Sequence, residues 1–197
     1  MIERAEAPRM TTLTRPFDIL AKHYSTGSTA YEILTVHSVL VTQLALEIAE
    51  RYTERNPDTT VDLQFITEAA LLHDIGIVGC NAKAIGCEGE EPYICHGVIG
   101  REILDAEGLP RHALVCERHT GSGIRANEVR EAALPLPERD FLPVSVEEKI
   151  ICVADKFYGK NPRKLWRRQE LGAIDRKIAA WGDGPKTRWE KLKREFL

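Results

Sequence analysis

The chain has 197 residues, enough for one domain with a single large core that needs no disulfide or metal staples. Its 27 lysines and arginines nearly balance 30 aspartates and glutamates, which argues against recognition of duplex nucleic acid or an anionic membrane through overall charge. Residues 1–10 are charged and lack the apolar region of a signal peptide, and we expect no membrane-spanning stretch further along. These features predict a cytoplasmic protein.

The five cysteines include no C-x-x-C pair, a usage typical of a reduced protein rather than of a disulfide framework. Cys80, Cys87, Cys95 and Cys116 invite a structural zinc site, but their spacing matches no common zinc knuckle. We therefore expect small buried thiols.

Apolar residues with helical spacing predict two helices in the first half of the chain. The first is amphipathic and covers about 28–52, with Ser28 or Thr29 as its N-cap. The second is mostly buried and runs from Asp62 to Gly76, a glycine that suits a helix end.

The middle of the chain alternates between a loop and further helices. Residues 79–92 hold three glycines and mixed charge, so we expect a surface loop there. Helical patterns follow over 95–107 and 110–118, divided by a glycine and a proline. A third strongly apolar helix is predicted from Ser145, the start of a capping box, to Gly159.

The basic tail from about residue 163 is predicted to form two helices separated by residues 182–185. The tail also carries three tryptophans. From the sequence, three roles stay open for it: packing on the core, closing a pocket, or forming a dimer. We find almost no strand alternation, and we predict an all-α fold in three parts: an N-terminal segment with a short helix (1–27), a helical core (28–160) and a C-terminal helical tail packed on the core (161–197).

Ionisable residues interrupt each strongly apolar helix. His37 shares the apolar face of its helix, His73 and Asp74 follow a buried leucine pair, and Asp155 ends an apolar run. A buried neutral histidine or a capping carboxylate explains any one of them alone, but a buried carboxylate is costly unless it is paired or coordinated. The four together predict a divalent transition-metal site suited to iron, manganese, nickel or zinc.

Two further histidines, His96 and His119, lie where helices meet glycine-rich chain, and they suit a second cation. If Asp74 bridged two cations, the pair would generate a hydroxide placed for in-line attack on phosphorus. The alternative is that one of these histidines binds substrate or lies on the surface. We predict that the remaining two, His23 and His112, are surface residues.

The order His37, His73-Asp74, Asp155 resembles the H…HD…D signature of the HD-domain metal-dependent phosphohydrolases. HDIG, which includes Ile75 and Gly76, resembles the hallmark of one subgroup. The resemblance spans 37–155 and implies an all-helical core whose central helices bring the four ligands to one metal. It assigns residues 28–160 as the metal-dependent hydrolase core.

His96 and His119 resemble the extra ligands of the two-metal branch, which includes diadenosine polyphosphate hydrolases and cyclic-dinucleotide phosphodiesterases. Two departures concern the substrate. The lysine that often follows HDIG is Ile77, and the glycine-tyrosine-proline element of the cyclic-dinucleotide enzymes is replaced by HTGSGI. The short sequence fragments HTG, AD and NPR resemble those of the dinucleoside polyphosphate branch more closely than those of the cyclic-dinucleotide enzymes.

Cations and backbone amides near the site are the candidates for neutralising phosphate. We expect Asp74 and Lys156 to be catalytic, and we expect substrate to be bound by a wider set: Lys83, Arg118, Gly121, Ser122 and Arg163.

The function predicted from the sequence is hydrolysis of a small phosphorylated substrate, a nucleotide above all, by attack of a metal-bound hydroxide. A homodimer is possible. Two other functions stay open: a di-iron oxygenase built on the same ligands, and a module that senses a nucleotide without catalysis.

Overall fold

The structure, a computed structural model, describes residues 14–197, so the N-terminal stretch on which the signal-peptide prediction rests lies outside the described residues. The described part is all-α, as predicted. Its α-helices are α1 (Thr14–His23), α2 (Thr29–Arg55), α3 (Leu63–Leu72), α4 (His96–Ala106), α5 (Pro110–Arg118), α6 (Ala126–Glu131), α7 (Val146–Asp155), α8 (Leu171–Ala179) and α9 (Asp183–Phe196).

Short elements connect these helices. Strands β1 (Asn81–Ala82) and β2 (Cys87–Glu88) pair antiparallel, with Asn81 opposite Glu88. The 3-10 turns are η1 (Ile75–Gly79), η2 (Lys83–Ile85), η3 (Tyr93–Cys95) and η4 (Pro162–Lys164).

The predicted N-cap residues form hydrogen bonds at the starts of α2, α3 and α7. Ser28 accepts a hydrogen bond from the Tyr31 amide, and Asp62 accepts one from the Phe65 amide. Ser145 accepts one from the Glu148 amide at the start of α7. These bonds satisfy amides that the first helical turn leaves unpaired, which is why the starts of α2, α3 and α7 were predictable.

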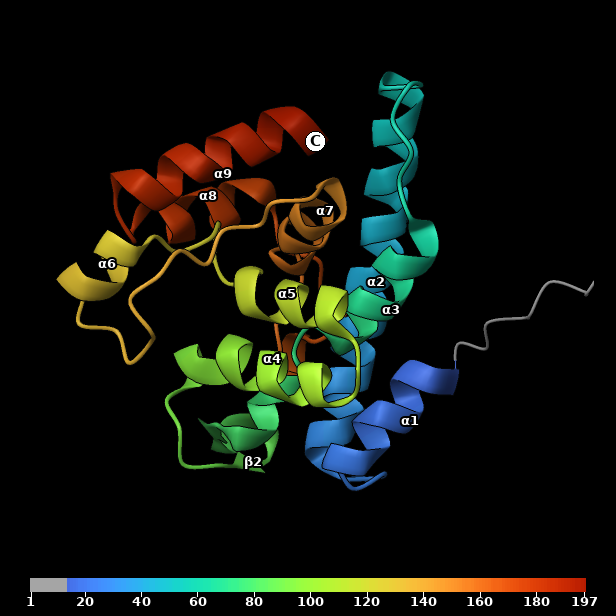
Figure 1. Cartoon of the computed structure of the whole chain (residues 1–197), viewed down its shortest axis with the longest axis vertical. Helices are drawn as coiled ribbons and strands as arrows, with labels where there is room; N and C mark the ends of the chain where they lie inside the picture. The colour runs from blue at the N-terminus through green and yellow to red at the C-terminus, as the bar shows by residue number, and fades with distance from the viewer. Residues whose placement is uncertain (1–13) are drawn as a thin grey trace, which may run out of the picture.

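The core lies where α2, α3 and α7 meet, and the tail covers it. In Figure 1, α2 runs along one side of the molecule with α3 beside it, while α8 and α9 lie together beyond α7. Ile174 and Ile178 of α8 and Trp189 and Phe196 of α9 are buried in the same apolar cluster as α7. The tail therefore packs on the core.

Helix α2 is apolar enough to correct one expectation. By length and composition alone it could cross a membrane, although we expected no such stretch. Of its most apolar part, 56% is buried inside the molecule. The buried apolar residues of α2 pack against other helices, as expected for a core helix with one apolar face.

Gly76 is not the helix end that we predicted. Helix α3 stops at Leu72, and Gly76 lies inside η1, where the start of α4 crosses it. A β-carbon at this position would lie 2.1 Å from the His96 carbonyl oxygen and 2.2 Å from the Gly100 amide nitrogen. Glycine is needed here because two backbones touch.

Two other boundaries and one loop also differ from the predictions. Helix α7 ends at Asp155 rather than Gly159, and Gln169 of the tail donates hydrogen bonds to the carbonyls of Lys156 and Phe157 just beyond it. Residues 183–185 form the first turn of α9 rather than a linker. Residues 79–92 contain β1 and β2, and Ile85 is buried there, so this stretch is not a simple surface loop.

All five cysteines are free and buried, which confirms the expectation of buried thiols. Burial raises the pKa of Cys80 to about 11, so this thiol stays protonated at neutral pH.

His112 is buried, contrary to its predicted surface position, while His23 is half-buried. The His112 imidazole donates from Nε2 to Glu68 Oε2 at 3.2 Å and meets the Phe65 ring edge-on. Burial lowers the pKa of His112 more than the Glu68 carboxylate raises it. The side chain is therefore neutral in the folded protein near pH 7.

This lowered pKa predicts how stability changes with pH. As the pH falls below about 6.5, unfolded chains bind a proton at His112 that the folded protein does not, so the free energy of unfolding decreases. In His112→Gln, which keeps a donor to Glu68 but does not titrate, we expect a smaller decrease between pH 7.5 and 5.5. Urea denaturation of both proteins at the two pH values checks this, and equal decreases would contradict it.

Candidate metal centre

Four side chains from three helices converge on one point in the core. His37 comes from the N-terminal half of α2, His73 and Asp74 follow the end of α3, and Asp155 is the last residue of α7. His37 Nε2 lies 3.0 Å from Asp74 Oδ2 and 3.1 Å from Asp155 Oδ1. His73 Nε2 lies 2.9 Å from Asp74 Oδ2 and 3.4 Å from Asp155 Oδ1. The structure thus brings together the four residues predicted as one ligand set.

These separations fit a shared divalent cation. Ligand atoms about 2.1 Å from one metal ion lie about 3.0 Å apart as neighbours in an octahedron and about 3.4 Å apart in a tetrahedron. The two imidazole Nε2 atoms, from His37 and His73, are themselves 3.3 Å apart. All of these separations lie within the range that a common ion requires.

Hydrogen bonds on the far side of the imidazoles orient them for such an ion. His73 Nδ1 lies 2.7 Å from the Ala70 carbonyl, which can only accept, so Nδ1 carries the proton and Nε2 faces Asp74 with its lone pair in the neutral ring. Within residues 14–197, neither Asp74 carboxylate oxygen accepts a hydrogen bond of good geometry. In a neutral ring that lone pair would face a buried carboxylate, a contact that is favourable only if a proton or a metal cation lies between them.

A second group shares Asp74. His96 begins α4 and His119 follows the end of α5, and their Nε2 atoms are 3.1 Å apart. Asp74 Oδ1 lies 3.6 Å from His96 Nε2 and 3.5 Å from His119 Nε2. Their Nδ1 atoms donate to the carbonyls of Tyr93 at 2.6 Å and Cys116 at 2.8 Å. The two oxygens of Asp74 therefore face two separate histidine pairs.

Burial and charge act in opposite directions within this cluster. Burial alone raises the pKa of Asp74, but His73 and Lys160 beside it hold that pKa well below its usual range. Burial alone lowers the pKa of His73, but Asp74 and Asp155 raise it to about 9. Burial, reinforced by His119, lowers the pKa of His96 to about 3. The carboxylates are ionised, and His96 offers a neutral imidazole, as a metal ligand must.

Lys160 is a site residue that the sequence analysis missed. Its Nζ lies 2.6 Å from Asp74 Oδ2, and its side chain is 15% exposed. Burial lowers the pKa of Lys160, but the Asp74 and Asp155 carboxylates raise it further, so this lysine is charged. Its only sequence signal is its position shortly after Asp155, and a lysine in an irregular segment lies on the surface by default.

A cavity of about 330 Å³ opens onto these ligands. His96, His119 and Asp155 form its inner wall, while His37, His73 and Asp74 lie behind them. The cavity is also lined by three lysines and by residues of the tail: Lys156, Lys160, Lys177, Gln169, Ile174, Ile178 and Trp181. The tail therefore forms one wall of the site as well as covering the core.

Lys156, predicted to be catalytic, and the predicted substrate-binding residues fall into two groups. Gly121 and Lys156 line the cavity, and Lys156 Nζ lies 2.6 Å from Asp155 Oδ2. Ser122 is buried beside it and donates to the Pro185 carbonyl at 2.8 Å. The structure does not bring the others to this cavity: Arg118 pairs with Glu148 at 3.1 Å, Lys83 is exposed, and Arg163 lines a neighbouring hollow.

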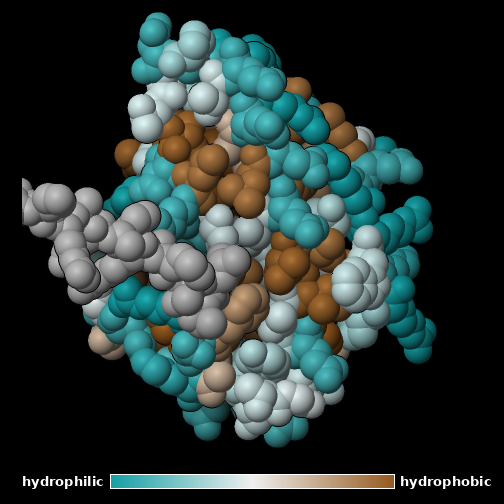
Figure 2. All heavy atoms as spheres, turned by 90° about the vertical axis from the view of Figure 1, so that its right-hand side faces the viewer, coloured by the Kyte–Doolittle hydropathy of each residue, from teal (hydrophilic) through white to brown (hydrophobic). Residues whose placement is uncertain are grey.

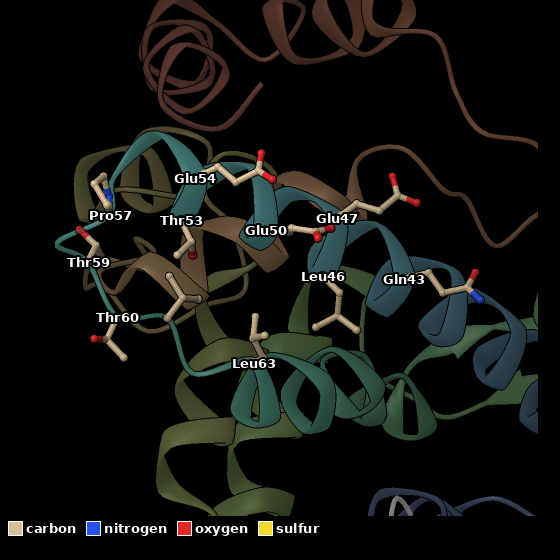
Figure 3. A pocket seen from close by; sticks show the side chains of 11 residues that line it. Gln43, Leu46, Glu47, Glu50, Thr53, Glu54, Pro57, Thr59, Thr60 and Leu63 are labelled. Atoms are coloured by element: carbon tan, nitrogen blue, oxygen red, sulfur yellow. The ribbon is translucent and has the colours of Figure 1, made fainter.

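A groove larger than this cavity lies elsewhere on the molecule. Its volume is about 930 Å³, and it lies between the C-terminal part of α2 and the segment leading into α3. Figure 3 shows Leu46 and Leu63 in this groove with glutamates such as Glu47 and Glu54 at its edge. Figure 2 shows apolar patches among hydrophilic side chains on the face that carries α1, α2 and α3. This groove contains none of the histidines of the metal cluster, so size does not identify the site.

The model of the HD domain family matches residues 35–159, a stretch that begins just before His37 and ends just after Asp155. The chain belongs to the HD-domain family. Proteins with this domain form a superfamily of metal-dependent hydrolases. The HD domain has an all-α fold, in agreement with the helices described above. Both groups of residues that could hold a metal ion, His37, His73, Asp74 and Asp155 on one side and Asp74, His96 and His119 on the other, lie within the matched residues.

Three relatives share this sequence in part. An uncharacterised protein of Methanocaldococcus jannaschii is 38% identical over 64% of this chain and 66% of its own length. A tRNA (cytidine(56)-2'-O)-methyltransferase of Thermoplasma volcanium is 33% identical over 71% of this chain but only 35% of its own length. An enzyme of the same name from Picrophilus torridus is 36% identical over 49% of this chain and 25% of its own.

The chain thus spans just under two thirds of the first relative and about a third and a quarter of the two methyltransferases. No solved structure matches.

Proposed function

We propose that this HD domain is a phosphohydrolase that binds two divalent metal ions and hydrolyses nucleotides or other small phosphate esters. The observation that supports it best is the shared carboxylate, since the two oxygens of Asp74 face two histidine pairs on opposite sides. A pair of cations so bridged would acidify a water molecule and draw charge from a phosphoryl oxygen. The HDIG subgroup, the preferred metal among iron, manganese, nickel and zinc, the domain boundaries, the cytoplasmic location and a homodimer all stay predictions.

The chain's own residues have separate roles in this proposal. Lys156 holds Asp155 Oδ2 at 2.6 Å, which leaves Oδ1 directed at His37 and His73. Lys160 is the cation that faces Asp74 from the cavity side. A metal ion near Asp74 would repel the Lys160 ammonium toward the cavity, where it would neutralise charge on a bound phosphate.

The decisive experiment measures phosphate release from a panel of phosphate esters, nucleotides and dinucleoside polyphosphates. The protein is stripped with a chelator and reloaded with manganese, iron, nickel or zinc. Release that requires metal and fails in its absence supports the proposal.

Two outcomes would replace it. If product forms only with iron and dioxygen and no product forms under anaerobic conditions, the result would favour the oxygenase. Tight nucleotide binding in calorimetry without phosphate release over hours would favour the sensing module. The methyl transfer named for two of the relatives is not part of the proposal, because the match covers so little of those proteins.

His119→Ala tests the two-ion arrangement. The variant keeps His37, His73, Asp74 and Asp155, so we expect one of two metal equivalents to remain and phosphate release to fall at least about 10-fold. Elemental analysis after exhaustive dialysis counts the ions. His112→Ala removes a buried histidine outside the cluster and is the matched control, expected to retain both ions. An unchanged metal content in His119→Ala would show that His119 does not hold an ion.

A further inference from the structure

A second cavity adjoins the one that opens onto the metal ligands. Its volume is about 310 Å³, and it shares four lining residues with the first cavity: Ile94, Thr120, Gly121 and Trp181. The volume of each cavity is at the lower end of the range for small-molecule sites, so a ligand of nucleotide size would need both cavities.

The two cavities differ in charge. Lys156, Lys160 and Lys177 line the first one together with one carboxylate, Asp155, so cations outnumber carboxylates there. The second is lined mainly by apolar side chains, including Ile124 and Leu134, and its one ionised side chain is Glu128, which pairs with Arg188 at 2.7 Å. An anionic group is therefore favoured in the first cavity, and a neutral apolar group in the second.

Trp181 stands between the two cavities and belongs to neither the HD match nor a regular helix. It lies between α8 and α9, outside residues 35–159, and is 50% exposed. A β-carbon on Gly121 would lie 3.2 Å from a carbon of the Trp181 ring, so the glycine lets the ring approach the loop after α5. An exposed indole at the junction of a cationic and an apolar cavity offers a flat surface for a planar ring.

We propose that the second cavity holds the nucleobase of a nucleotide substrate, stacked on Trp181, while its phosphate occupies the first cavity near the metal ligands. This inference rests on the proposed phosphohydrolase function and names its substrate class. Stacking on an aromatic side chain tolerates different bases, because each base has an aromatic face. Trp181 is accordingly a substrate-binding residue supplied by the C-terminal tail.

The test compares two substrates in three variants. The metal-loaded protein is assayed with the common 5'-mononucleotides and with ribose 5-phosphate, which carries the same phosphate without a base. In Trp181→Ala we expect KM for the mononucleotides to rise about 10-fold with KM for ribose 5-phosphate unchanged. Trp181→Phe restores most of the nucleotide affinity. Trp166→Ala removes a 72% exposed tryptophan that lines neither cavity and should match the wild type.

Other outcomes would overturn the base site. An unchanged nucleotide KM in Trp181→Ala would do so while leaving the phosphohydrolase function intact, and so would an equal rise for both substrates. If the wild type hydrolyses neither, calorimetry with the same mononucleotides decides. Binding that Trp181→Ala abolishes supports the base site although the hydrolase proposal has failed. Binding that survives the substitution, or no binding to the wild type, overturns it.

Discussion

Replacing Asp74 by asparagine is expected to empty both metal positions and to lower metal-dependent phosphate release at least about 100-fold. Asp74 is the residue common to the two ligand groups, and both of its oxygens face imidazole nitrogens. Asparagine keeps the size of the side chain but removes the negative charge that offsets two cations. No other residue in residues 14–197 appears in both groups, so no other single substitution should act on both ions alike.

Metal content by elemental analysis and phosphate release are measured together, with circular dichroism to show that the fold persists. Asp105→Asn is the matched control, because it makes the same chemical change at a carboxylate on α4 that pairs with Arg101 at 3.3 Å, outside the cluster. Two bound equivalents in Asp74→Asn would contradict the bridging role.

Gly76→Ala is expected to be the most destabilising small substitution near the site, lowering the free energy of unfolding by about 3 kcal/mol. The added carbon would meet the His96 carbonyl at 2.1 Å and the Gly100 amide at 2.2 Å, and backbone atoms cannot rotate away. The start of α4 must shift, and His96 shifts with it. We therefore expect weaker binding of the ion held by His96 and His119, with the other ion less affected.

Urea denaturation and metal titration measure the two effects. Gly172→Ala is the control, since its added carbon would meet only the Arg176 side chain at 3.7 Å and alanine suits helix α8, so it should not lower stability. A Gly76→Ala protein as stable as the wild type would show that α4 does not depend on this close approach.

The elements that were predictable have local causes. A helix start needs only an oxygen to accept from an amide three residues on, so Ser28, Asp62 and Ser145 could be assigned from their neighbours. The metal ligands were also visible locally, because an ionisable residue within an apolar run is costly and therefore conspicuous. The contacts between His37, Asp74 and Asp155 required only that three buried helices share one core.

The features that were missed depend on contacts between distant segments. Gly76 suited a helix end by its local neighbours, and only the crossing of α4 makes it a point of close approach. Lys160 lies in the irregular segment after α7, and its contact with Asp74 joins residues that are far apart in the sequence. Trp181 enters the cavity wall only because α8 and α9 fold back over α7 (Figure 1). Local sequence patterns carry no information about such tertiary contacts.

The most direct test of the two-ion centre is anomalous diffraction from crystals of the manganese-loaded protein. The arrangement predicts two peaks on either side of the Asp74 carboxylate, one against His37, His73 and Asp155 and the other against His96 and His119. No peak at Asp74, or peaks only at other residues, would contradict the claim that these side chains form a metal centre.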